Sequence, residues 1–121
     1  MLDFDKIESG EVDDIKILGV EASYWQDLYS HQGIAMARTL AKPVLVMLGD
    51  RDYQVSDIDI ASWRKGLKGS RGFVAITLPG LNHLFMKGKG KPGPEEYSTP
   101  CKVEPDVIDR IAAFVKNSES F

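Results

Sequence analysis

In this 121-residue sequence, one carboxylate and one imidazole suited to acid–base chemistry each follow an apolar run. Asp52 comes shortly after Val44–Leu48, and His83 comes shortly after Phe73–Leu78. A carboxylate fixes the tautomer of a neighbouring imidazole and stabilises its protonated form, so the other ring nitrogen is free to accept a hydroxyl proton. Loops that leave the carboxyl ends of parallel strands meet at one rim of a sheet. Asp52 and His83 are therefore the candidate catalytic pair.

The two apolar runs predict the strands that would position this pair. Val44–Leu48 is bounded by Pro43 and Gly49, and such a run is typical of a parallel strand buried on both faces. Phe73–Leu78 reads as a second buried strand. Ser56 is placed to cap an intervening helix, whose predicted inner face is Ile60, Trp63 and Leu67. A strand–helix–strand succession predicts neighbouring parallel strands.

The flanking segments predict further helices and one strand. Apolar residues at three- and four-residue spacing predict two short helices over 22–40, with a break near Ser30 to Gly33. Residues 15–20 predict a short strand, and Pro105 suits the first turn of a C-terminal helix. That helix has a predicted apolar face of Val107, Ile108, Ile111, Ala112, Phe114 and Val115. Tyr24, Trp25 and Tyr29 are predicted core aromatics.

These elements predict an α/β fold with a few-stranded parallel sheet and helices on both faces. Residues 1–14 carry six acidic side chains against Lys6 alone, which predicts a solvated, frayed segment. We expect residues 15–121 to form the folded part of the chain.

Other residues compete for catalytic roles and are interpreted as non-catalytic. Asp50 is expected to cap the turn after the first strand, and His31 is expected at the surface between two helices. Cys101 has no cue that would activate its thiol. The remaining candidates are serines that do not follow a strand in a strained turn: Ser23, Ser30, Ser56, Ser62, Ser70 and Ser98.

Composition excludes several classes of function. A formal net charge of -3 and a pI near 5.3 argue against nucleic-acid binding, and Lys87, Lys89 and Lys91 alternate with glycine as in a solvated loop. A single cysteine forms no internal disulfide, and no metal-ligand spacing is present. No apolar run is long enough to cross a membrane, and the start of the chain does not resemble a signal peptide. We expect a cytoplasmic protein without metal or cofactor.

The sequence around the candidate pair resembles a known family. The stretch Pro43–Asp52 followed by Leu81–His83 is similar to the acid and histidine turns of α/β-hydrolases, especially dienelactone hydrolases and prolyl-oligopeptidase-like bacterial hydrolases. The likeness spans roughly 20–116 and includes Ser23-Tyr24-Trp25, Asp52-Tyr53-Gln54-Val55, Leu84-Phe85-Met86 and Glu96-Tyr97. It implies a partial α/β-hydrolase fold in which 15–121 form the C-terminal half. It also implies that Asp52, third after Gly49, is the acid and His83 the base.

The family's serine nucleophile is absent from this sequence. It sits in a G-x-S-x-G turn that precedes the acid and the histidine, and no such pentapeptide occurs here. One interpretation is a truncated serine hydrolase for esters, lactones or peptides, inactive alone and in need of a complementing N-terminal half. The other is a non-catalytic structural or interaction protein that self-associates. Because the strand at 44–48 would have an open edge, we also expect a homodimer unless 15–20 pairs with that edge.

Overall fold

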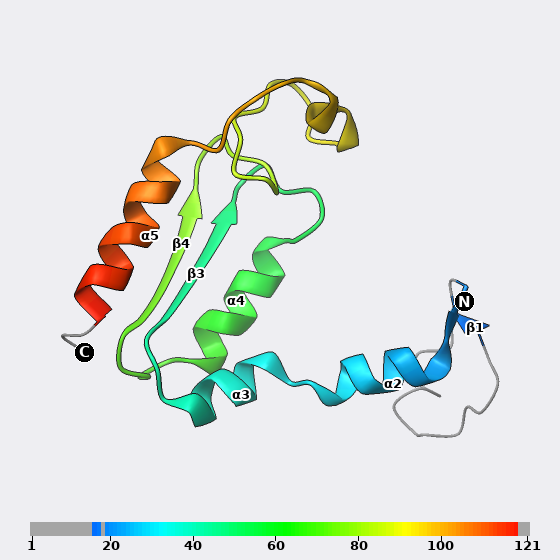
Figure 1. Ribbon diagram of the computed structural model, residues 1–121, viewed down its shortest axis with the longest axis vertical. Helices are drawn as coiled ribbons and strands as arrows, with labels where there is room; N and C mark the ends of the chain where they lie inside the picture. The colour runs from blue at the N-terminus through cyan, green and yellow to red at the C-terminus, as the bar shows by residue number, and fades with distance from the viewer. Residues whose placement is uncertain (1–15, 18, 119–121) are drawn as a thin grey trace. The chain divides into compact units, whose positions relative to one another are not determined.

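The computed structural model describes residues 16–17 and 19–118 (Figure 1). Contacts between Cα atoms divide the chain into a first unit up to Met36 and a second unit from Ala37. The predicted acidic segment 1–14 lies outside the described residues. None of the helices in the described part of the chain has the length and apolar character needed to cross a membrane.

The described part of the first unit contains a hairpin where a single strand was predicted. Strands β1 (Lys16–Ile17) and β2 (Val20–Glu21) pair antiparallel. Gly19 lies between them with a φ of 80°, a left-handed conformation that glycine adopts without steric cost. The prediction of one strand over 15–20 was therefore wrong. The alternative in which this segment pairs with the strand at 44–48 stays a prediction.

Two helices follow the hairpin, as predicted. Helix α2 spans Ala22–Ser30 and helix α3 spans Gly33–Leu40, so the expected break is confirmed. The expectation of an aromatic core was wrong for two of its three residues. Tyr24 and Tyr29 are exposed, and the buried residue of α2 is Ala22.

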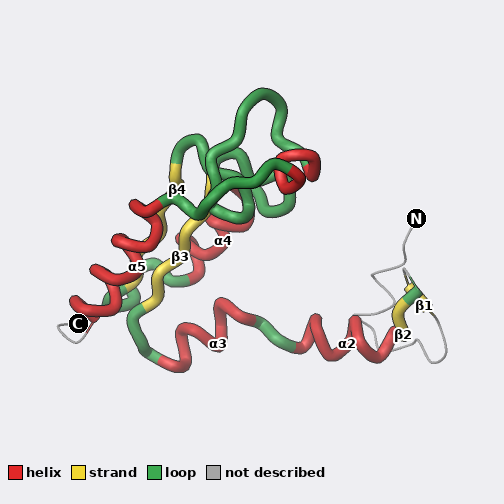
Figure 2. The backbone as a smooth tube through the Cα atoms, turned by 45° about the horizontal axis from the view of Figure 1, so that its top comes forward, coloured by secondary structure: helices red, strands yellow, loops and turns green. Residues whose placement is uncertain are grey.

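The second unit contains the parallel sheet that the apolar runs predicted (Figure 2). Strands β3 (Val44–Gly49) and β4 (Phe73–Leu78) pair in parallel, with Val44 opposite Phe73 and Gly49 opposite Leu78. Helix α4 (Asp57–Gly66) connects them and contacts both. Each strand has one paired edge, and no other described strand joins this sheet.

Helix α4 begins at the predicted cap. The backbone N–H and the hydroxyl of Ser56 both donate to Asp59 Oδ2, at 2.8 and 2.9 Å. These bonds hold the pKa of Asp59 below its ordinary value. Ile60 and Leu67 are buried, as expected for the inner face of the helix.

Helix α5 (Pro105–Asn117) lies on the other side of the two strands from α4 (Figures 1 and 2). Its Val107 packs with Leu78 and Leu81, and Met47 and Ile76 pack against this cluster. The predicted apolar face is only partly covered: Ile108, Ile111 and Val115 are exposed. A short 3-10 helix, η1 (Pro94–Ser98), precedes α5. The second unit is thus α/β, with a small parallel sheet between helices, as predicted.

Candidate active site

The loops that leave β3 and β4 are bonded directly to each other. The backbone N–H of Arg51 donates to the carbonyl of Leu81 at 3.0 Å, and the N–H of Asp50 donates to Leu78 at the same distance. The Asp50 carboxylate accepts the N–H of Gly80 at 2.7 Å. Asp50 was predicted to cap its own turn, but its carboxylate instead ties that turn to the loop that follows β4.

Asp52 and His83 meet across these loops. Asp52 Oδ2 lies 2.9 Å from His83 Nδ1. The Asp52 side chain is 5% exposed and the His83 side chain is 37% exposed, so the carboxylate is enclosed while the ring reaches the surface. The structure therefore brings together the two residues singled out in the sequence. Their catalytic role remains a prediction.

The Asp52 carboxylate is held by backbone as well as by the imidazole. Its Oδ1 accepts the N–H groups of Gln54 and Val55, at 2.8 and 3.0 Å. Burial alone would raise the pKa of Asp52, but the bonds from Val55, His83 and Gln54 outweigh burial, so its pKa lies below the ordinary value. Asp52 is therefore an ionised acceptor near neutral pH, and it favours the tautomer with the proton on Nδ1 of His83.

The second ring nitrogen of His83 is available for chemistry. No described residue makes a hydrogen bond with Nε2, and Nδ1 is the only ring atom bonded within the described chain. An imidazole fixed in this way can accept a proton from a hydroxyl placed within about 2.6–3.2 Å of Nε2. The arrangement can thus serve as a general base, provided that a nucleophile lies beside it.

Two other residues weighed in the sequence, His31 and Cys101, have different partners. His31 belongs to the first unit, where its Nε2 lies 3.6 Å from the Asp27 carboxylate. Cys101 is exposed, and its thiol makes only long contacts to the carbonyls of Lys87 and Lys102.

The serine hydroxyls that have described partners bond locally. Ser30 and Ser62 donate to carbonyls of their own helices, and Ser56, the N-cap of α4, donates to Asp59 Oδ2. No described serine is hydrogen-bonded to His83.

Sequence reasoning missed a set of contacts among three residues that joins the loops of Asp52 and His83. Arg51 forms an ion pair with Glu96, and Glu96 Oε2 accepts a bond from Asn82 Nδ2 at 3.3 Å. The bond from Arg51 is the main reason that the pKa of Glu96 lies below its ordinary value. Glu96 was part of the family resemblance, but nothing in its spacing pointed to a partner 45 residues away.

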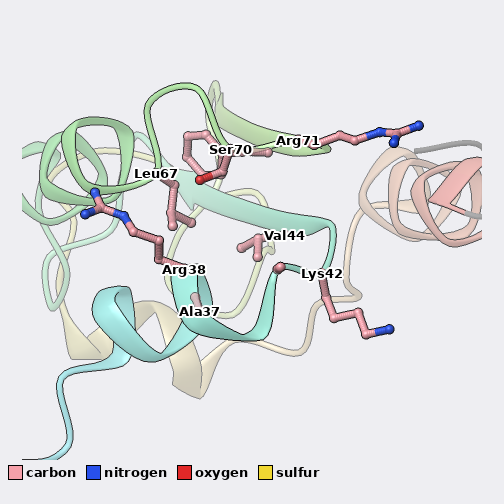
Figure 3. A pocket seen from close by; sticks show the side chains of 9 residues that line it. Ala37, Arg38, Lys42, Val44, Leu67, Ser70 and Arg71 are labelled. Atoms are coloured by element: carbon pink, nitrogen blue, oxygen red, sulfur yellow. The ribbon is translucent and has the colours of Figure 1, made fainter.

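A cavity of about 220 Å³ is shown in Figure 3. Val44 and Phe73, the first residues of β3 and β4, line it, so it lies at the opposite end of the sheet from the loops of Asp52 and His83. Its cationic side chains are Arg38, Lys42 and Arg71. In Figure 3, Arg38 extends to one side and Lys42 and Arg71 to the other, so the three charges do not converge on one point.

Within the described residues, no group of three or more His, Cys, Asp or Glu side chains is arranged to hold a metal ion.

The fold and the site together define a class: an α/β scaffold with a carboxylate–imidazole pair at the carboxyl ends of adjacent parallel strands. Comparison with known proteins finds esterase EstD of Thermotoga maritima, which is 37% identical over 99 residues. The match covers 82% of this chain but 24% of EstD, so the chain spans about a quarter of the length of that relative. No protein-family model and no solved structure matches. This chain is therefore similar to a segment of an esterase.

Proposed function

We propose that this chain carries the acid and the base of a serine esterase of the α/β-hydrolase superfamily. The observation that carries the proposal is the 2.9 Å contact between Asp52 Oδ2 and His83 Nδ1 where two parallel strands end. The similarity to EstD supports carboxylic esters as the substrate class. Lactones and short peptides undergo the same acyl-transfer chemistry and are the next candidates.

In the proposed reaction, His83 moves protons and Asp52 orients it. His83 Nε2 takes the proton of a serine hydroxyl while the serine oxygen attacks the ester carbonyl carbon. The imidazolium, stabilised by Asp52, then gives that proton to the departing alkoxide, and an acyl-enzyme remains. A water molecule then gives a proton to the same nitrogen and attacks the acyl carbonyl, and His83 passes that proton to the serine oxygen as the carboxylic acid is released.

The serine and the oxyanion donors are proposed to come from polypeptide outside these 121 residues. The sequence contains no G-x-S-x-G, and no described serine is bonded to His83. Loss of a single oxyanion donor costs about 3–4 kcal/mol of transition-state stabilisation in enzymes where it has been measured. The 121-residue chain by itself is therefore proposed to be inactive, and a segment carrying the nucleophile is its proposed partner.

A non-catalytic, self-associating protein is the second candidate. It is favoured by the exposed apolar residues of α5, which are Ile108, Ile111 and Val115, and by the open edges of the two-stranded sheet. Exposed apolar faces and unpaired strand edges attract further polypeptide. A homodimer related by a two-fold axis would cover both features.

The decisive experiment for the proposed function is a chimera. The 99-residue segment of EstD that matches this chain is replaced by the corresponding residues of this chain, and hydrolysis of p-nitrophenyl acetate is measured. Circular dichroism and urea unfolding report whether the chimera folds. The proposal predicts ester turnover by the folded chimera. A folded chimera with no turnover above buffer would contradict it.

A further inference from the structure

A single carboxylate bridges the two loops that carry Asp52 and His83. Glu96 pairs through Oε1 with Arg51, which directly precedes Asp52. It accepts through Oε2 from Asn82, which directly precedes His83. Glu96 and Arg51 are largely enclosed, with side chains 10% and 17% exposed. The carboxylate therefore touches the chain one residue away from each member of the pair.

Asn82 fixes the backbone of the histidine turn. Its side chain is among the most buried polar groups described, at 1% exposed. Its Oδ1 accepts the N–H groups of Leu84 and Met86, at 3.0 and 3.2 Å. Its backbone N–H donates to the carbonyl of Met86 at 3.0 Å. These bonds enclose His83 in a tight turn in which Phe85 has a φ of 55°, so the ring direction depends on Asn82 staying in place.

Arg51 holds the other end of the bridge and also bonds to the glycine-rich loop that contains Gly88 and Gly90. Its Nη1 donates to the carbonyl of Gly90 at 2.9 Å. A Cβ at Gly88 would overlap the Glu96 carboxylate and come within 2.7 Å of Arg51 Nε, so this loop packs directly onto the ion pair. The loop shields the Arg51–Glu96 ion pair from water. An enclosed ion pair holds its two side chains in place more strictly than an exposed one.

We propose that Glu96 is a positioning residue that sets the direction of the His83 imidazole by holding Asn82 and Arg51 together. Asp52 contacts the ring, whereas Glu96 acts only through the backbone of the two loops. The relevance of this role to catalysis rests on the proposed function. Its geometric content, that the Asp52–His83 bond depends on Glu96, is tested without any turnover.

The test is ¹⁵N NMR of the His83 ring in the 121-residue chain, which reports the ratio of the Nδ1–H to the Nε2–H tautomer. In the wild-type chain the ring is expected as the Nδ1–H tautomer, because Asp52 accepts that proton. Glu96→Ala is expected to shift the ratio toward that of the urea-unfolded chain. Glu96→Gln is expected to shift it less than Glu96→Ala, because the amide keeps one acceptor oxygen whereas alanine has none. Glu96→Gln also keeps the test available if Glu96→Ala does not fold.

Glu104→Ala is the matched control. Glu104 forms an ion pair with Lys87 at 2.9 Å, and its backbone is bonded to Phe85 of the histidine turn, but no bond joins it to Asn82 or Arg51. The control is expected to leave the tautomer ratio unchanged. A wild-type ratio in a folded Glu96 variant would overturn the proposal, and so would an equal shift in Glu104→Ala, which would indicate general loosening of the loop. Either result would leave the ester-hydrolysis proposal standing, because the chimera measures turnover separately.

Discussion

Gly49, the last residue of β3, lies directly against the backbone of Leu81 in the loop that follows β4. A Cβ at Gly49 would overlap the carbonyl oxygen of Leu81 and lie 2.9 Å from the carbonyl oxygen of Asn82. The close approach allows the N–H of Arg51 to reach Leu81 at 3.0 Å. The loops that carry Asp52 and His83 can thus lie this close together because Gly49 has no side chain.

Gly49→Ala is expected to destabilise the chain by about 3 kcal/mol, toward the upper end of the usual cost of overpacking, because backbone must move. Gly69→Ala is the comparison, since Gly69 has open space around it and a φ of 81°. That variant is expected to lose about 1 kcal/mol from left-handed backbone strain alone. Urea unfolding of both variants checks the difference, and an equal or smaller loss in Gly49→Ala would refute the packing argument.

The stability of the chain is expected to fall in acid. Asp52 and Glu96 have folded-state pKa values below their ordinary values of 3.8 and 4.5. The unfolded chain therefore binds protons at higher pH than the folded chain, so the free energy of unfolding falls as pH drops through 4.5 and below. Above that range the stabilisation from these two groups is fully present.

The Glu96→Gln variant measures how much Glu96 contributes to this loss of stability in acid. The variant has no carboxyl to titrate at this position, so its free energy of unfolding is expected to fall less steeply than that of the wild type between about pH 6 and pH 3. Urea unfolding across that range is the measurement. A slope as steep as that of the wild-type chain would show that Glu96 does not contribute.

The approach of Asp52 to His83 could be predicted from local sequence because each residue follows an apolar run. Buried parallel strands have nearly continuous apolar sequence, and their carboxyl ends share one rim. The hairpin of β1 and β2 was missed because the chain reverses within a very short turn that contains Gly19, whose φ is 80°. The spacing of apolar residues along the chain does not indicate such a turn.

The bridge from Arg51 through Glu96 to Asn82 could not be predicted from the same signals. Its bonds join residues of two loops to Glu96 in the short helix η1, and neither loops nor a single 3-10 turn have a periodicity that would place such residues. How much of the apolar face of α5 is covered could not be predicted for a different reason. An amphipathic pattern predicts which residues share a face, but whether Ile108 and Ile111 are covered depends on what packs against the helix.

The 121-residue chain alone is expected to show no triad-type ester hydrolysis, because His83 has no described hydroxyl beside Nε2. Release of p-nitrophenol and labelling by a fluorophosphonate are the measurements. Slow hydrolysis that survives His83→Ala is background from other groups. Turnover abolished both by His83→Ala and by one particular serine-to-alanine change would contradict the expectation.

Self-association is expected at micromolar concentration, with a mass twice the monomer value of 13.4 kDa. Ile111→Glu on the exposed face of α5 is expected to weaken it, since the charge would be buried on association. Ile58→Glu is the control, because Ile58 is a highly exposed residue of α4, remote in sequence from that face. Light scattering decides, and a monomer with cooperative unfolding would exclude the dimer.

The central claim, that Asp52 and His83 are the acid and base of an esterase, is tested most directly by kcat/KM for ester hydrolysis in the EstD chimera. His83→Ala and Asp52→Asn are each expected to reduce kcat/KM roughly 10²–10⁴-fold, the range for loss of general acid–base catalysis. Asp50→Asn is the matched control, because its amide oxygen can still accept the N–H of Gly80 while it has no contact with the ring. The account predicts near-unchanged turnover for the control and the large loss for the other two. Wild-type kcat/KM in a folded His83→Ala chimera would contradict it.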